Sequence, residues 1–293
     1  MLPAPPKPVV TLTTNKTTTY YSVHETTTAK IFHAIEAHGL RDQDGERAAG
    51  LTAAKSEMTL NGRETGALCT PEFVKITLNL VVTLPRHERV TDLSNDLRER
   101  WEHFAAAVAT HEQRHVDIFA NGANAAKARI EAALKNWASC AALQATVRSL
   151  WTNQEMETQK AQRVFDDEDR ARVAEDRKPL QAAIEAKKAQ LTRMSAEIRQ
   201  LDATLEDLSR RAGAVREKVD TVNADITKAN GNCSRPTERI QVLCRQYDAL
   251  VASHNAVVAE HSSVVAHRNR LADEHNVLVE SINALVEALN WVR

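Results

Sequence analysis

Glycine and proline, the residues that most often turn a chain, are scarce in this sequence. Its 293 residues include 8 Gly and 8 Pro, well below the average usage of about 12% for the two together. Beyond residue 122 there are only four: Gly213, Gly231, Pro179 and Pro236. A segment that turns so rarely cannot form a sandwich, a propeller or a doubly wound sheet, so long helices remain. We therefore predict a turn-rich N-terminal domain followed by a helical body.

Two heptad repeats define the helical body. Apolar residues recur at alternating steps of four and three over 180–229, and a second such repeat runs over 240–292. Three histidines fall in the a-like column of the second repeat: His254, His261 and His275. We interpret them as polar residues that specify the register of pairing. Because a turn at 230–237 separates two helices of similar length, we expect an antiparallel coiled-coil hairpin over 177–293.

The residues before the heptads contain three predicted strands. Residues 9–24 are rich in β-branched and aromatic side chains, which favour strands. We expect a second strand near 52–60. The clearest strand is 73–84, where apolar and polar side chains alternate, and we expect Pro85 to end it. Together with the helices described next, these strands predict a small α+β domain over 11–176.

Helical patterns accompany these strands. A short helix should end at Gly39. Spacings of three and four predict a helix over about 91–135, which Asn121-Gly122 either interrupts or leaves intact. A further helical stretch covers about 141–175. It ends in an acidic run: Asp166-Asp167-Glu168-Asp169.

Charge and hydropathy exclude several classes of protein. The 38 Lys+Arg and 39 Asp+Glu give a net charge of −1, which argues against a strongly basic nucleic-acid-binding protein. The chain has no run of about 18 apolar residues, so we expect no transmembrane helix. Residues 1–10 are a Pro-rich lead that we expect to be disordered, and they lack the pattern of a secretory signal.

One motif carries chemistry: His111-Glu112-Gln113-Arg114-His115. The i, i+4 spacing puts both imidazoles on one face of a helix, where they can share a tetrahedral Zn²⁺. Glu112, next to the first histidine, can act on the metal-bound water as general base. The alternative is two histidines on an amphipathic helix beside solvent, with no metal.

The four cysteines are Cys69, Cys140, Cys233 and Cys244. This even number is compatible with two disulfides but does not require them. Cys233 and Cys244 bracket the turn between the two heptad repeats, where a disulfide would lock the tip. The alternative for this pair is two free thiols.

Several landmarks around the HExxH motif occur in a fixed order. They are Tyr20-Tyr21-Ser22-Val23, Cys69, Leu84-Pro85-Arg86, Trp101, Phe104, His115-Val116-Asp117-Ile118 and Cys140-Ala141-Ala142-Leu143. With them, residues from about 12 to 172 resemble a bacterial family described as predicted secreted zinc-dependent proteases and otherwise of unknown function. The resemblance implies a zincin-like domain, a twisted sheet over an active-site helix, with His111 and His115 as ligands and Glu112 as base. It also implies a Cys69–Cys140 disulfide.

The resemblance leaves the third zinc ligand open. The family tends to carry a Tyr-Asp-x-x-Thr-x-His-Gly segment, whose histidine is a natural third ligand, but Ala171 stands at that position here. The family also usually has Gly where this chain has Arg114. A catalytic zinc normally has three protein ligands and one open position. Either an acid (Asp166, Glu168 or Asp169) completes the site, or the site is weakened or dead.

Two functions follow from these observations. The first is a zinc metallopeptidase that hydrolyses peptide or protein substrates. The second is a catalytically inactive zincin-like protein that acts through its coiled coil on a coiled-coil or homo-oligomer partner. The resemblance and the paired cysteines predict a secreted or periplasmic protein, with its signal removed or unrecognised.

Overall fold

The computed structural model describes residues 9–41, 45, 47–65, 68–134, 139–229, 232–234 and 236–292. Most of the predicted N-terminal lead, 1–8, and positions 230, 231 and 235 of the predicted turn lie outside the described residues. The chain divides into two compact units: Met1–Arg177 together with Asn290–Arg293, and Lys178–Leu289. None of the described helices has the length and apolar character needed to cross a membrane.

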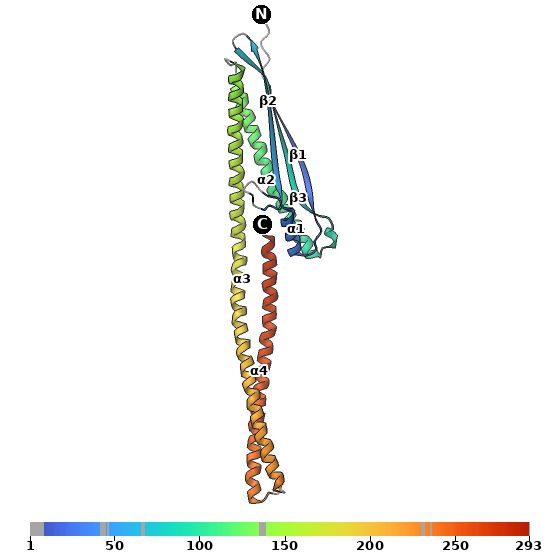
Figure 1. Ribbon diagram of the computed structural model, residues 1–293, viewed down its shortest axis with the longest axis vertical. Coiled ribbons are helices and arrows are strands. Elements are labelled where there is room, and N and C mark those ends of the chain that lie inside the picture. The colour runs from blue at the N-terminus through green and yellow to red at the C-terminus, as the bar shows by residue number, and fades with distance from the viewer. Residues whose placement is uncertain are drawn as a thin grey trace. The chain divides into compact units, whose positions relative to one another are not determined.

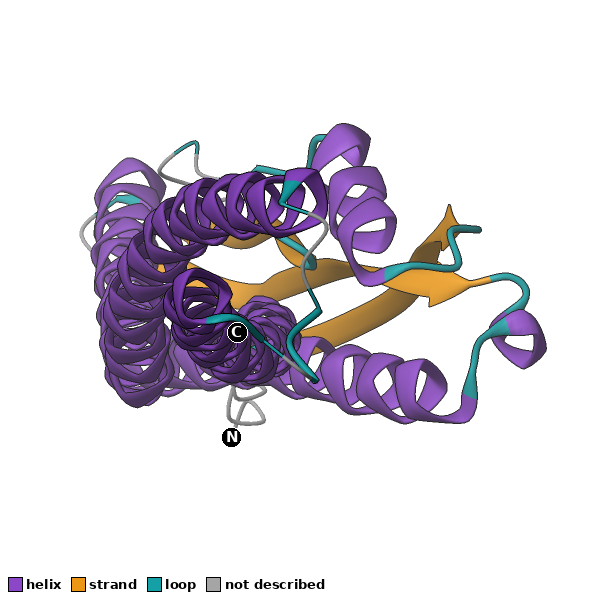
Figure 2. Cartoon of the chain, turned by 90° about the horizontal axis from the view of Figure 1, so that it is seen from below, coloured by secondary structure: helices purple, strands orange, loops and turns teal. Residues whose placement is uncertain are grey.

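A three-stranded sheet forms one layer of the first unit (Figure 1). Its strands are β1 (Val9–Val23), β2 (Leu51–Thr65) and β3 (Leu68–His87). β3 lies in the centre, parallel to β1 and antiparallel to β2. The sheet is therefore mixed, and the prediction of an α+β fold is confirmed. Helices make up most of the remaining chain (Figure 2).

The alternating side chains of β3 build the core of the first unit. The apolar set is buried: Val74, Ile76, Leu78, Leu80 and Val82. Helix α2 (Asn95–Ala133) covers this face of the sheet: its Val116 and Ala123 pack with Leu78, Leu80 and Val82, and its Ala126 and Ile130 pack with Val74 and Ile76. The period-two pattern of the sequence thus identifies the face that carries α2.

The expectation that Pro85 ends the central strand is wrong, because β3 continues to His87. Strand β2 pairs with β3 only as far as Leu51 opposite Thr83. Beyond that point β3 has a strand neighbour only in β1, so proline removes no hydrogen bond that β2 could have formed. The predicted second strand, 52–60, lies within β2, which extends beyond it at both ends, from Leu51 to Thr65.

The helices of the first unit begin and end at residues with clear local causes. α1 (Thr28–His38) ends at Gly39, as predicted, and the φ of 78° there is a left-handed conformation that glycine adopts at low cost. α2 begins after Ser94, whose hydroxyl accepts a hydrogen bond from the backbone N–H of Leu97. The predicted start at Thr91 is too early, because Val90–Asp92 forms a 3₁₀ turn.

Helix α2 contacts helix α3 (Cys140–Lys228) closely at Gly122. A Cβ atom on Gly122 would lie 2.1 Å from Oγ1 of Thr158, which is far inside van der Waals contact. The missing side chain is therefore what this position requires. Asn121-Gly122 does not interrupt α2, and the glycine lets the two helices approach one another.

The expected end of a helix near 175, before the first heptad repeat, does not occur. α3 is a single helix of 89 residues, and Pro179 lies inside it. An interior proline costs about 3 kcal/mol because it removes a hydrogen bond and clashes with the preceding turn. Buried side chains on both sides of it, such as Val147 and Ile184, offset this cost by anchoring the helix in the core of each unit.

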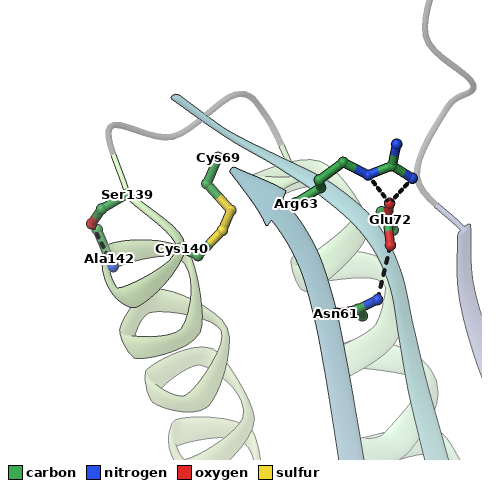
Figure 3. Close-up of a disulfide and its surroundings, with 7 residues drawn as sticks. All are labelled: Asn61, Arg63, Cys69, Glu72, Ser139, Cys140 and Ala142. Atoms are coloured by element: carbon green, nitrogen blue, oxygen red, sulfur yellow. Dashed lines mark hydrogen bonds and ion pairs between the residues drawn. A yellow bond between two sulfur atoms is a disulfide. The ribbon is translucent and has the colours of Figure 1, made fainter. Parts of the chain in front are cut away.

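A disulfide joins the beginning of β3 to the beginning of α3 (Figure 3). It connects Cys69, which is fully buried, to Cys140, with Cα atoms 4.9 Å apart. Nearby, Glu72 of β3 accepts hydrogen bonds from Asn61 and Arg63 of β2. The cysteine pairing that the family resemblance implies is therefore present.

The second unit consists of the later part of α3 and most of α4 (Glu238–Trp291). The two helices run antiparallel, since Ser195 of α3 lies 3.2 Å from the ring of His275 while residues nearer the turn pack against one another. The residues that pack together near the turn are Val222, Ile226, Ile240 and Cys244, and the first three of them occupy predicted heptad positions. A second disulfide, Cys233–Cys244, spans the turn as predicted.

Candidate metal centre

His111 and His115 lie one turn apart on α2, and both rings face α3. Their Nε2 atoms are 3.0 Å apart. Phe165 of α3 packs against both rings, with centroid distances of 4.9 and 5.0 Å. The i, i+4 spacing therefore produces the convergence of imidazoles that the motif predicts.

Asp166, the residue after Phe165, completes a cluster with the two histidines. Its Oδ1 lies 3.0 Å from Nε2 of His115 and 3.7 Å from Nε2 of His111. Within the described residues, this is the one group of three or more His, Cys, Asp or Glu side chains whose ligand atoms all lie within 4.8 Å of one another. The cluster joins two neighbouring helices whose ligands are about fifty residues apart in sequence.

The other residues considered for the third position lie elsewhere. Glu168 and Ala171 are exposed and contribute no atom to the cluster. Asp169 approaches from the outer side, with Oδ2 3.1 Å from Nδ1 of His111. Of the three acids proposed as third ligand, Asp166 is thus the one whose carboxylate lies near both Nε2 atoms.

Gln162 is a member of the site that sequence reasoning missed. It is fully buried, and its Oε1 lies 2.5 Å from Nδ1 of His115. Its Nε2 donates to the main-chain carbonyl of His115 at 3.1 Å. The signal available in the sequence is positional, because Gln162 precedes Asp166 by one helical turn and shares its face of α3.

These outer contacts decide which ring nitrogens carry protons. A carbonyl oxygen can only accept, so the amide nitrogen of Gln162 must face it and the amide oxygen must face the ring. Nδ1 of His115 therefore carries the proton and donates it. The Asp169 carboxylate imposes the same tautomer on His111. In neutral imidazoles of this tautomer, both Nε2 atoms present lone pairs to one another and to Asp166.

This convergence of acceptors fits a divalent cation. Around a tetrahedral zinc with bonds of about 2.0–2.2 Å, ligand atoms lie about 3.3 Å apart. The three separations here, 3.0, 3.0 and 3.7 Å, bracket that value. Two imidazoles and one carboxylate are also a donor set that zinc accepts. The residues could therefore hold such an ion and leave a fourth position open.

Glu112 lies beside the cluster and is only 4% exposed. Its Oε2 accepts a hydrogen bond of 2.7 Å from the hydroxyl of Thr52, which belongs to β2. Gly50 permits this approach, because a Cβ atom there would come within 2.8 Å of the Glu112 side chain. Burial raises the pKa of Glu112 above its ordinary value, and the hydrogen bond from Thr52 opposes that rise.

A cleft of about 890 Å³ opens over the cluster. It is lined by residues 47–52, by one face of α2, by α3 from Asp166 to Arg177, and by Trp291. Trp291 belongs to the first unit and packs against Phe32 and Phe104, with ring centroids 4.9 and 5.8 Å apart. Glu112 and all three cluster residues line this cleft.

Together, a mixed sheet, an HExxH helix across its face and a histidine–carboxylate cluster define an α+β domain with a candidate metal centre. Residues 18–172 match the family described as "Bacterial protein of unknown function (DUF922)", and the chain belongs to this family. The match includes every residue of the cluster and ends before the second unit begins. No curated protein and no solved structure matches the chain. The proteolytic function that the resemblance implies stays a prediction.

Proposed function

We propose that this protein is a zinc-dependent metallopeptidase of the zincin type. The observation that carries the proposal is the convergence of the Nε2 atoms of His111 and His115 with the Asp166 carboxylate, because this is a donor set and a spacing that zinc accepts. The acidic side chain takes the place of the histidine that Ala171 replaces. Carboxylates are ordinary third ligands in zinc peptidases.

His111, His115 and Asp166 would hold the zinc, which when bound polarises the substrate carbonyl and lowers the pKa of a water. Glu112 takes the proton from the attacking water and delivers it to the leaving nitrogen. Burial favours this role, because it raises the pKa of Glu112 toward neutral pH. Thr52 fixes the carboxylate in place through its hydroxyl.

The start of β2 supplies a place for an extended substrate. β2 is an edge strand of the sheet, and Leu51 and Thr52 line the cleft beside Glu112. A peptide can add to such an edge through main-chain hydrogen bonds, which bind any sequence in extended form. The carbonyl to be attacked would then lie next to the cluster.

The second unit has a separate role in this proposal, as an antiparallel coiled-coil arm that recruits a substrate or a second copy of the chain. Its inner contacts use heptad positions. The two disulfides support a location outside the cytoplasm.

The test separates metal binding from hydrolysis. Wild-type protein, stripped with a chelator and reloaded with zinc sulfate, should bind one zinc per chain and cleave peptides in a mixed peptide pool analysed by mass spectrometry. Glu112→Gln should retain zinc and lose cleavage. Asp166→Asn should lose zinc affinity by at least tenfold, whereas Glu168→Gln, its matched control on the same helix, should behave as wild type.

Two results would contradict the proposal. One is wild-type protein that takes up no zinc and shows no thermal shift when zinc is added. The other is peptide cleavage that persists in Glu112→Gln. Uptake of zinc without cleavage by the wild type would leave the inactive, interaction-only alternative as the better description.

A further inference from the structure

Five arginines line the cleft, and four of them have carboxylate partners. The pairs are Arg47–Glu36, Arg100–Asp96, Arg170–Asp167 and Arg172–Asp169. The fifth, Arg177, forms no hydrogen bond or ion pair within the described part of the chain, and its Nε is buried. Arg177 therefore gives the cleft a cation that no carboxylate of the described chain neutralises.

A second donor in the same state lies in the same cleft. Nε1 of Trp291 is buried without an acceptor. Across the described residues only three buried side-chain atoms lack a partner, and the third is Oε1 of Gln154, which is outside this cleft. Two residues that line one cleft thus each carry an N–H donor without an acceptor, one of them on a cation, and such donors favour an anionic acceptor.

The acids at this end of the cleft do not fill that role. Asp96 is held by Arg100 at 3.0 Å. Glu99 has His103 at 4.0 Å. Both acids project from the first turns of α2, and within the described residues neither forms a hydrogen bond or ion pair with Arg177. No acid of the described chain therefore satisfies the two donors.

The spacing along α3 places this pair well away from the metal cluster. Asp166, Val173 and Arg177 all line the cleft from one face of the helix. Eleven residues separate the first from the last, which is about 16 Å at 1.5 Å per residue. An extended peptide covers that distance in about five residues. Apolar side chains such as Phe104 and Val108 line the wall opposite this stretch of α3.

We propose that Arg177 and Trp291 form a subsite for a carboxylate of the peptide substrate, about five residues from the bond cleaved at the metal cluster. This inference rests on the proposed peptidase function and names the substrate class. The carboxylate belongs either to a Glu or Asp side chain or to the C-terminus of the substrate, since both present the same acceptor. The Arg177 guanidinium supplies the charge, and the Trp291 indole supplies a second, directed hydrogen bond.

The test uses full-length Glu112→Gln protein, so that peptides bind without being cleaved. Three pools of random octapeptides built from neutral residues, each labelled with an uncharged BODIPY dye, are compared by fluorescence anisotropy. One pool is amidated, one has a free C-terminal carboxylate, and one is amidated and contains a single Glu. At least one carboxylate pool should bind about tenfold more tightly than the neutral pool. The pool that does so identifies the source of the carboxylate.

Substitutions in the same background assign the preference to the subsite. Arg177→Gln should abolish it, and Trp291→Phe, which keeps an aromatic ring but lacks the N–H, should weaken it several-fold. Arg47→Gln is the matched control, because Arg47 lines the same cleft but is already paired with Glu36. It should retain the preference. Arg177→Lys keeps the positive charge and should retain part of the preference for carboxylate peptides. A loss in Arg177→Gln that Arg177→Lys partly restores is then due to the charge and not to a folding defect.

The proposal is overturned if no pool binds, if the three pools bind equally, or if Arg177→Gln keeps the preference. It is equally overturned if Arg47→Gln loses as much as Arg177→Gln, because the effect would then be general to positive charge. Zinc content is measured on the same samples. A chain that prefers carboxylate peptides but takes up no zinc would retain the subsite and refute the peptidase.

Discussion

Gln162 holds His115 at two points, accepting from the ring Nδ1 at 2.5 Å and donating to the main-chain carbonyl of the same residue at 3.1 Å. The imidazole therefore cannot rotate or change tautomer without breaking its hydrogen bond to Gln162. Because Gln162 belongs to α3 and His115 to α2, the contact also fixes the rotation of one helix against the other. It orients the Nε2 lone pair before any ion arrives.

The first prediction concerns this orienting contact. Gln162→Leu fills similar volume but cannot accept the proton of Nδ1, so the affinity for zinc should fall by about 10- to 100-fold. The affinity is measured by competition with a chromophoric chelator at pH 7. Gln159→Leu, an exposed glutamine on the same helix, is the control. Equal affinities in the two variants would show that the contact does not orient the ligand.

The second prediction concerns pH. Burial raises the pKa of Glu112, and the hydrogen bond from Thr52 lowers it, since that bond favours the ionised carboxylate. Thr52→Val removes the second effect, so the pKa should rise further. Because the base must be ionised, the acidic limb of the profile of kcat/KM against pH should move to higher pH. Thr52→Ser keeps the hydroxyl and should leave the limb in place; an unshifted limb in Thr52→Val would contradict the assignment.

The third prediction concerns the approach of α2 to α3. Gly122→Ala places a Cβ atom 2.1 Å from Oγ1 of Thr158, so it should reduce the free energy of unfolding by about 1–3 kcal/mol. Adding Thr158→Ala removes the clashing atoms and should restore part of that loss. Gly213→Ala has open space around it and should stabilise the chain by about 0.5–1 kcal/mol. Urea denaturation checks all three, and a neutral Gly122→Ala would mean that the helices separate easily.

The fourth prediction concerns the disulfides. Cys69–Cys140 closes a sequence separation of 71 residues and Cys233–Cys244 one of 11. Loop-closure entropy gives about 4 kcal/mol for the longer loop and about 3 kcal/mol for the shorter one. Double Cys→Ser variants should lose stability in that order, measured by urea denaturation under oxidising conditions. The reverse order would show that strain or residual structure outweighs the loop entropy.

Features with a local cause were predictable from the sequence. The alternation around Val74–Val82 identified the central strand, Gly39 ended its helix, and the spacing of His111 and His115 put two imidazoles together. The predicted ends of a strand at Pro85 and of a helix before Pro179 were wrong, because the effect of a proline depends on the segments packed around it. At Pro85 a pairing strand had already ended, and at Pro179 the packing of distant residues carries the helix onward.

The complete site was not predictable, because it depends on how two helices face one another. Choosing Asp166 over Glu168 and Asp169 requires the rotation of α3 relative to α2. That rotation is set in part by the contact of Gly122 with Thr158. The hydrophobic periodicity of each helix alone does not reveal this contact. Gln162 was missed for the same reason, since a buried glutamine becomes informative only when its partner is known.

The disulfide at the beginning of α3 has a consequence for the site further along that helix. Cys140 ties α3 to β3, and the same helix brings Gln162, Asp166 and Asp169 to the rings on α2. An ion that binds only the assembled site stabilises the folded chain, and a disulfide that favours the same state does so as well. The two are therefore thermodynamically coupled: a bound ion should make the thiol pair harder to reduce, and reduction should loosen the ion.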